Sequence, residues 1–255
     1  MSRVLVTGLG CVSVLGADAG ETWRRLLANE SGVAIEDITA AAEAECSVAA
    51  PMARVREDFE GPLIRRFGRK VIGAEDRFSK LATAATLVLE SKRHARARGT
   101  RFYAELAGHG ASADAAHLTK PNAETAAEAV LHAHRDAGLP PDEPLLISAH
   151  GTGTLLNDIT ETEVFSSVYG AKLAWNLVIT TMAANGHTLG AAKAMEFLIA
   201  VLALYNPMAP PVHGFLGRHP VCDLPLVLAT PDIAYRAAIS TTFAFCGLNC
   251  TLVTR

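Results

Sequence analysis

Short apolar runs alternate with longer segments of helical period along most of this chain. Most of the runs lack polar positions on either side of the pleat, which is typical of strands buried on both faces. The predicted strands are residues 3–8, 102–107, 145–149, 174–181, 226–229, 235–241 and 250–254, and the predicted helices are residues 21–29, 122–137, 158–169 and 187–204. Strands and helices that alternate in this way predict an α/β fold.

The strand predicted at 145–149 leads directly into a stretch rich in polar groups. His150 follows the strand, and the loop after it carries hydroxyl groups at Thr152 and Thr154. In open α/β folds, ligands bind outside the carboxyl ends of the strands. The sequence therefore predicts a site at His150.

The helix after this loop has a start signal of its own. Asn157 or Asp158 is the expected N-cap, and Glu161 stands three residues beyond Asp158, as in a capping box. We therefore expect the helix to begin at residue 158.

A second strand–loop–helix segment repeats this arrangement. His187 follows the strand predicted at 174–181 and opens a helix whose residues are almost all apolar. Two such segments, each delivering one histidine to the same edge of a sheet, predict a single site that contains His150 and His187.

Composition narrows the class of protein. Half of the 255 residues are hydrophobic, so the chain can bury a sizeable core and is not disordered. A net charge of −3 gives no electrostatic reason to expect binding to nucleic acid or to a membrane surface. Lys193 and Glu196 interrupt the most apolar helix, so no run reaches the roughly 18 residues of a membrane span.

The five cysteines show neither an even count nor the spacing of a zinc site. We expect no disulfide framework and no bound metal. The N-terminus enters a strand without the pattern of a signal peptide, which favours a reduced, cytoplasmic protein.

Several motifs, taken in order, resemble one family. The chain carries HGTGT, LND and TE between 150 and 162, GHTLGAA at 186–192 and STTFAFCGLN at 240–249; it opens with VLVTGLGCVSVLG at 4–16 and continues at 94–110 with HARARGTRFYAELAGHG. Together they resemble the β-ketoacyl-acyl-carrier-protein synthases, enzymes of the thiolase-like α/β fold. The resemblance covers most of residues 1–30 and nearly all residues from Leu87 onward.

The resemblance implies an uneven division of the chain. Residues 91–255 correspond to an essentially complete C-terminal half, and residues 1–90 to a reduced N-terminal part. In the family, a long block with the nucleophilic cysteine separates the first helices from a VLVLE-like segment. Here residues 76–85 run straight into Leu87–Glu90. The expected protein is therefore a truncated ketosynthase homologue without the nucleophilic cysteine block.

The resemblance also assigns roles to side chains. His150 and His187 match the histidines that stabilise the enolate and the thioester oxyanion. Thr152 and Thr154 match threonines that bond the phosphopantetheine arm, which the acyl carrier protein presents, so no bound cofactor is expected. The alternatives are that the histidines are vestigial and that the threonines only shape the turn.

Met182 is a further departure from the family pattern. Met182 stands where the family has a lysine, which leaves Glu196 without its expected partner. An unpaired buried carboxylate is costly, so Glu196 is expected to be neutral, solvated or bonded to a nearby donor, for which Asn185 is a candidate. Glu196 is expected at the substrate site all the same.

Departures also occur at the family's glycine-rich gating loop. Phe243 opens this loop and is a candidate substrate contact, but Ala244 and Cys246 replace glycines and restrict the backbone. Cys246 and Cys11 are poor substitute nucleophiles, because neither follows a strand and opens a helix.

The leading functional hypothesis is a non-condensing partner subunit, similar to the chain-length factors of type II fatty acid and polyketide systems. It would stabilise a full-length ketosynthase and bound its acyl tunnel. The first alternative is an enzyme that decarboxylates malonyl-carrier protein or condenses with another nucleophile. The second is a module that binds acyl carrier protein, for which the basic residues Arg65, Arg66, Arg69 and Lys70 offer a face, unless they are only a solvated helix surface.

Overall fold

The computed structural model describes residues 3–32, 85–115, 117, 120–232 and 235–255. The basic residues at 65–70 lie outside the described residues, as does nearly all of the junction at 76–85.

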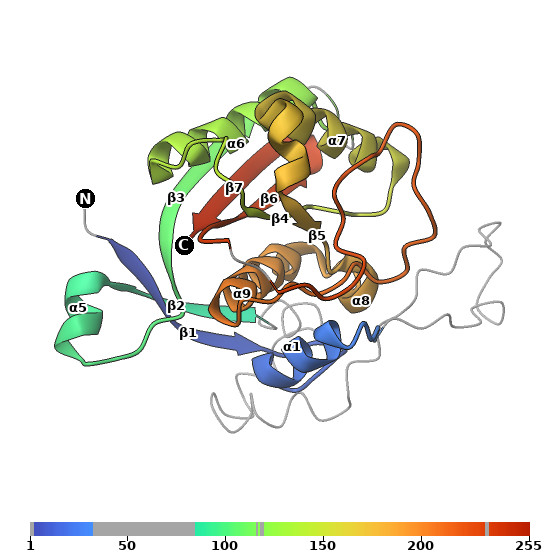
Figure 1. Cartoon of the computed structure of the whole chain (residues 1–255). Coiled ribbons are helices and arrows are strands. Elements are labelled where there is room, and N and C mark those ends of the chain that lie inside the picture. The colour runs from blue at the N-terminus through green and yellow to red at the C-terminus, as the bar shows by residue number, and fades with distance from the viewer. Residues whose placement is uncertain (1–2, 33–84, 116, 118–119, 233–234) are drawn as a thin grey trace, which may run out of the picture.

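A single seven-stranded sheet organises the described chain (Figure 1). Its strands are β1 (Val4–Cys11), β2 (Ala85–Ser91), β3 (Ala104–Ala113), β4 (Leu146–Ser148), β5 (Leu177–Ile179), β6 (Ala238–Ala244) and β7 (Leu248–Thr254), in the order β2-β1-β3-β7-β6-β4-β5. β4 pairs in parallel with both β5 and β6, whereas the other pairs are antiparallel. The parallel strands therefore end at one edge, where β4 and β5 each deliver a loop.

Helices cover both faces of the sheet (Figure 1). The α-helices are α1 (Ala19–Leu27), α5 (Lys92–Ala97), α6 (Ala123–Ala137), α7 (Leu155–Tyr169), α8 (Met182–Asn185) and α9 (Ala192–Tyr205), and the 3-10 segments are Gly170–Trp175, Leu189–Ala191 and Phe245–Gly247. α6 and α7 pack on one face, and α9 with α1 on the other. This layered arrangement confirms the predicted α/β fold.

The strand β4, which lies between β6 and β5, shows why its apolar run has no polar side. Leu145 and Ile147 point into the core under α6 and α7, while Leu146 points into the core under α9. All three side chains are fully buried. A strand covered on both faces can use apolar residues at every position.

The approach of α6 to the sheet depends on glycine. A Cβ on Gly110 would collide with the backbone of α6 at the Ala129 carbonyl, and one on Gly108 would collide with Ala137. These two positions on β3 therefore let the helix backbone lie directly on the strand.

The N-terminal segment joins the same sheet as the rest of the described chain through β1. β1 pairs with β2 on one side and with β3 on the other, and Glu105 accepts hydrogen bonds from Arg3 and Arg255 near both ends of the chain. The predicted boundary at residue 90 falls within β2. The division into 1–90 and 91–255 remains a prediction.

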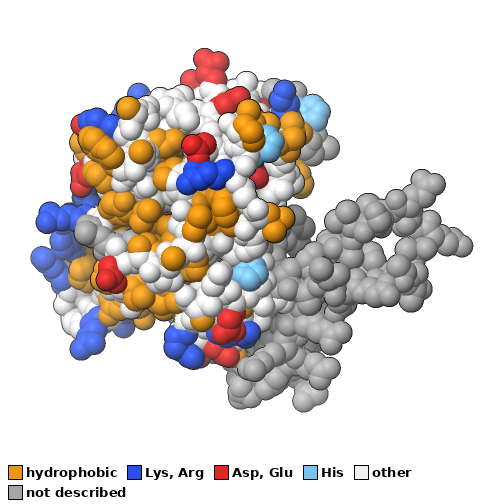
Figure 2. Space-filling model, turned by 45° about the vertical axis from the view of Figure 1, so that its right-hand side comes forward, with side chains coloured by type: hydrophobic (Ala, Val, Ile, Leu, Met, Phe, Trp, Pro, Cys, Tyr) orange, Lys and Arg blue, Asp and Glu red, His pale blue; other side chains and the backbone are white. Residues whose placement is uncertain are grey.

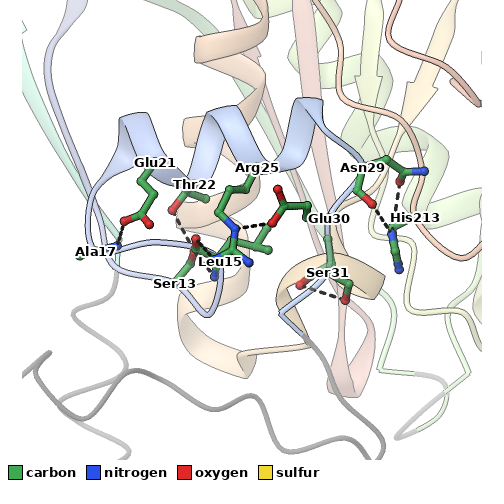
Figure 3. Close-up of polar contacts among 11 residues, drawn as sticks. Ser13, Leu15, Ala17, Glu21, Thr22, Arg25, Asn29, Glu30, Ser31 and His213 are labelled. Atoms are coloured by element: carbon green, nitrogen blue, oxygen red, sulfur yellow. Dashed lines mark hydrogen bonds and ion pairs between the residues drawn. The ribbon is translucent and has the colours of Figure 1, made fainter.

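Polar contacts tie the segment around α1 to distant parts of the chain (Figure 3). Ser13 Oγ lies 2.9 Å from Thr22 Oγ1, and the His213 ring lies 2.9 Å from the Asn29 carbonyl. Ser31 Oγ donates to the carbonyl of Ala183 in α8. The segment after α1 therefore supports the short helix that precedes His187.

Several predicted bounds need correction. α7 begins at Leu155 rather than at 158, with Thr154 as its N-cap. The strand predicted at 174–181 shrinks to β5, because residues 170–175 form a 3-10 turn. The run at 226–229 contributes one bridge, between Leu226 and Val178. Among the described residues, no helix has the length and apolar character of a membrane span.

Candidate active site

His150 lies at the carboxyl edge of the sheet, two residues beyond the end of β4. Its side chain is 7% exposed. Its backbone N–H donates to Glu161 Oε1 at 2.6 Å, and the next N–H, of Gly151, donates to Glu161 Oε2 at 2.7 Å. Glu161 thus fixes the backbone that carries the histidine.

The capping-box pattern predicted that Glu161 caps the helix, but Glu161 has a different role. It lies within α7, is fully buried, and accepts a third hydrogen bond from Asn157 Nδ2 at 2.8 Å. Burial raises the pKa of this carboxyl, while the bonds from Gly151 and His150 oppose that rise. Sequence reasoning gave Glu161 the wrong role, because its partners become neighbours only when the loop folds back.

The turn after His150 requires glycine. Gly151 has φ +52°, and a Cβ there would collide with the Thr180 side chain. Thr180 Oγ1 in turn donates to the Gly151 carbonyl at 3.2 Å. The loop after β4 is therefore pinned to the loop after β5.

His187 lies in that second loop, two residues before the 3-10 segment Leu189–Ala191, whereas the sequence predicted it inside a helix. The structure brings the two histidines together as the sequence predicted: their ring centroids lie 5.6 Å apart, with the rings at 86°. His187 is exposed, whereas His150 is buried. The site thus has one buried and one accessible imidazole.

Both imidazoles are neutral near pH 7. Burial, followed by Lys193 and His187, lowers the pKa of His150 to about 3. Burial and Lys193 also lower the pKa of His187. A neutral imidazole offers one N–H donor and one acceptor, so the pair can donate hydrogen bonds to an oxygen without carrying charge.

Glu196 has a partner that the sequence analysis missed. Its Oε2 accepts a close ion-pair contact from Lys193 Nζ, three residues earlier in α9. Burial raises the pKa of Glu196 to about 7, and Lys193 opposes that rise. The prediction that Glu196 lacks a cation is therefore wrong, and Asn185 is not its donor, because neither side-chain polar atom of Asn185 has a hydrogen-bond partner among the described residues. The i,i+3 spacing of Lys193 and Glu196 was the signal available in the sequence.

The remaining predicted residues lie in varied surroundings. The hydroxyls of Thr152 and Thr154 lie 2.9 Å apart and form a hydrogen bond. Phe243 is buried with the core residues under α6 and α7. Cys246 has φ +63°, a conformation that favours glycine. The substrate roles of Thr152, Thr154 and Phe243 remain predictions.

Several buried polar atoms at this edge of the sheet have no hydrogen-bond partner among the residues that the structure describes. They include Ser148 Oγ, His150 Nδ1, both side-chain polar atoms of Asn185, Thr188 Oγ1 and Glu196 Oε1. Native proteins leave few such atoms in apolar cores, and their concentration is typical of a site that binds a polar group. Within the described ranges, no cluster of three or more His, Cys, Asp or Glu side chains could hold a metal ion.

Comparison with known proteins agrees with this geometry. Residues 103–216, which include both histidines, match the family described as "Beta-ketoacyl synthase, C-terminal domain". The matched residues are therefore similar to a β-ketoacyl synthase C-terminal domain. The matched region contains both histidines, together with Glu161, Lys193 and Glu196.

Curated relatives extend the similarity. The chain is 39% identical to "Nodulation protein E" of Rhizobium sp. (strain N33) over 176 residues, which cover 68% of this chain and 43% of that protein. It is 36% identical to "3-oxoacyl-[acyl-carrier-protein] synthase 2" of Coxiella burnetii over 173 residues, covering 67% of this chain and 42% of that protein. The chain thus matches less than half the length of these relatives.

Solved structures share the fold. "The ishigamide ketosynthase/chain length factor" superposes with a TM-score of 0.79 at 22% identity, covering 99% of this chain and 98% of that chain. A β-ketoacyl synthase from Burkholderia phymatum gives a TM-score of 0.77 at 20% identity, covering 100% and 99%. These matches confirm the thiolase-like ketosynthase fold.

Proposed function

We propose that the chain is a ketosynthase-like subunit that holds a thioester at His150 and His187 but forms no acyl-enzyme of its own. The observation that carries the proposal is the pair of neutral imidazoles, 5.6 Å apart, at the carboxyl edge of the sheet. Such donors stabilise an oxyanion in an enclosed site.

Three of the four described cysteines favour the absence of a nucleophile. A cysteine attacks as its thiolate, so an active thiol needs a lowered pKa. Burial instead raises the pKa of Cys11 to about 11, and burial also raises the pKa of Cys222 and Cys250. These three thiols are therefore protonated near pH 7.

The site edge also offers apolar surface for a protein partner. β4 and β6 are parallel, so the loops that follow them share one edge, and there Leu155, Leu156, Phe245 and Leu248 are all more than half exposed. Figure 2 shows hydrophobic side chains gathered over one face of the molecule, with charged groups among them. Exposed apolar patches commonly mark partner surfaces. We assign the surface formed by Leu155, Leu156, Phe245 and Leu248 to contact with a full-length ketosynthase subunit, as in the chain-length-factor arrangement.

An acyl carrier protein is the expected second partner. The carrier would bring the phosphopantetheine thioester, and Thr152 and Thr154 would bond its amide groups. The hydroxyl of Thr154 is exposed enough to reach a ligand, since residues 153–156 all lie at the surface.

A second candidate function is decarboxylation of malonyl-carrier protein. The observation in its favour is again the lowered pKa of both histidines, because a neutral imidazole can donate to an enolate oxygen. Decarboxylation would require no nucleophilic cysteine.

Two assays separate these functions. Co-expression with a full-length ketosynthase, followed by size-exclusion chromatography, should give a heteromeric complex; a stable monomer that ignores every co-expressed ketosynthase would contradict the partner role. Carbon dioxide release from malonyl-carrier protein, abolished in His150→Ala and His187→Ala, would favour the decarboxylase. If the wild type releases no carbon dioxide, the result favours the partner-subunit role.

A further inference from the structure

Among the described strands, β2 forms the end of the sheet that lies away from the histidine site. The strand order is β2-β1-β3-β7-β6-β4-β5, and the two histidines follow β4 and β5 at the opposite end (Figure 1). β2 pairs with β1 along its whole length, and no other described strand pairs with it. The outer N–H and C=O groups of such an edge strand can pair with another extended chain.

The surroundings of β2 suit a polypeptide at this edge. Val88 and Leu89 are each about half exposed. A groove of about 670 Å³ lies where β2 passes into α5, and its lining residues are Leu89, Glu90, Ser91, Arg93, His94 and Ala97. None of them is Phe, Tyr or Trp, the side chains on which the bases of single-stranded nucleic acids stack. Strand addition instead uses backbone groups beside apolar side chains, and β2 offers both.

The segment that follows β2 is strongly basic. From Ser91 to Arg101 it carries no acidic residue, and its cations are Lys92, Arg93, Arg96, Arg98 and Arg101. Arg98 pairs with Glu90 at 2.8 Å, whereas the other four cations form no ion pair with another described residue. The net charge of the whole chain is −3, so the positive charge is concentrated locally. A partner with carboxylates complements this surface.

A second copy of this chain would supply a strand but not the charge. β2 contains one carboxylate, Glu90, which already contacts Arg98 at 2.8 Å and His94 at 3.3 Å. Pairing β2 with another β2 would therefore leave the cations of α5 without a counter-charge. The charge favours an acidic partner over self-association.

We propose that the outer edge of β2 and the basic helix α5 form a docking surface for an acidic protein segment in extended conformation. The segment adds an antiparallel strand to β2. Its amino end then lies opposite the carboxyl end of β2, where α5 begins at Lys92, so acidic residues at the amino end contact the cations. The docking surface goes beyond the proposed function, because it shares no residue with the histidine site or with the apolar surface assigned to the ketosynthase subunit.

The test is a peptide titration of the full chain, followed by fluorescence anisotropy. The probe is the labelled peptide Glu-Glu-Val-Thr-Val-Thr-Val. One control peptide has Lys in place of both Glu residues, and another has Pro at the central position, where it removes a ladder hydrogen bond. We expect the acidic peptide to bind and each control peptide to bind about tenfold more weakly or worse. Hydrogen exchange should slow at residues 85–91 when the acidic peptide binds.

Charge reversal locates the surface. Arg93→Glu combined with Arg96→Glu should weaken binding of the acidic peptide by about tenfold or more, because carboxylates then face carboxylates. The matched control combines Arg24→Glu in α1 with Arg135→Glu in α6, both at exposed positions. It changes the net charge equally and should leave the affinity within about twofold of the wild-type value. If circular dichroism shows that the first pair does not fold, all four positions are changed to Gln and compared in the same way.

Four results would overturn the proposal. The first is no binding of the acidic peptide at about 1 mM, and the second is equal binding of the Lys peptide. The third is a dimer of the chain alone, seen by light scattering, whose residues 85–91 are already protected from exchange, because a second copy would then occupy the edge. The fourth is a single-stranded RNA that binds more tightly than the acidic peptide and leaves exchange in β2 unchanged.

Discussion

The two histidine-bearing loops reach the same site in different ways. The loop after β4 is held by a buried carboxylate: Glu161 accepts the N–H groups of His150 and Gly151. The loop after β5 is exposed at His187 and follows α8, a helix of only 4 residues. The first histidine is fixed through its backbone N–H, whereas the second follows a short helix to which Ser31 donates a hydrogen bond.

The position of a histidine and its protonation state therefore depend on different residues. Glu161 determines where His150 lies, while Lys193 contributes to the protonation state of both rings. Substitutions at these two positions should therefore have different signatures, one in folding and the other in titration. The following variants test that separation, beginning with the largest expected effect.

Glu161→Ala should destabilise the protein most. It leaves the buried N–H of His150 and the partly buried N–H of Gly151 without their acceptor and removes the shorter hydrogen bond of the Asn157 amide, at a cost of about 3 kcal/mol or more. Urea unfolding measures the loss. Glu163→Ala, at an exposed position on the same helix, is the control and should change the unfolding free energy by less than about 0.5 kcal/mol. Equal effects for the two variants would show that Glu161 does not anchor the loop.

Met182→Lys should also destabilise the protein. Met182 is 8% exposed, and Glu196 already has Lys193 as its cation, so a new ammonium would be buried without a partner. We expect a loss of about 2–4 kcal/mol in the unfolding free energy at neutral pH.

Met182→Lys should cost less unfolding free energy when Lys193 is absent. In Lys193→Met, the added lysine would supply the charge that Glu196 lacks, so the effects of Met182→Lys and Lys193→Met should not add. The double-mutant cycle measures this coupling. Additive losses would show that position 182 does not face the carboxylate.

The fold and the site were predictable to different degrees. The apolar runs predicted the α/β fold and the meeting of His150 and His187, because carboxyl ends of parallel strands share one edge. The role of Glu161 and the Lys193–Glu196 pair were not predicted, because both depend on contacts made only after the loops fold back. The start of α7 was placed too late, since Thr154 ends the loop without a side-chain cap.

His150→Asn should remove part of the acid sensitivity of the fold. The folded-state pKa of His150, about 3, lies below the usual 6.5, so its stabilising contribution is present above pH 6.5 and is lost as the pH falls toward 3. Between about pH 7 and pH 5, this should cost the wild type about 2 kcal/mol that the variant does not lose.

Glu196 changes the unfolding free energy with pH in the opposite direction over this range. Its pKa is raised from 4.5 to about 7, so its contribution is present below 4.5 and is lost as the pH rises through 7. The difference between wild type and His150→Asn isolates the histidine. Parallel curves of unfolding free energy against pH would contradict its lowered pKa.

Cys246→Gly should have the smallest effect, and it should stabilise. Cys246 is exposed and holds φ +63°, which a glycine adopts without strain. We expect a gain of about 1 kcal/mol, read as a higher melting temperature. Cys250→Gly is the control, since this exposed cysteine lies in β7 with ordinary backbone angles and a glycine there should destabilise.

The central claim is that this subunit holds a thioester without forming an acyl-enzyme. Intact mass spectrometry after incubation with acyl- and malonyl-carrier protein tests it most directly. The account predicts that the mass of the chain is unchanged and that no β-ketoacyl product forms. A mass increase equal to an acyl group, mapped to any cysteine of the chain, would contradict it and would identify the nucleophile.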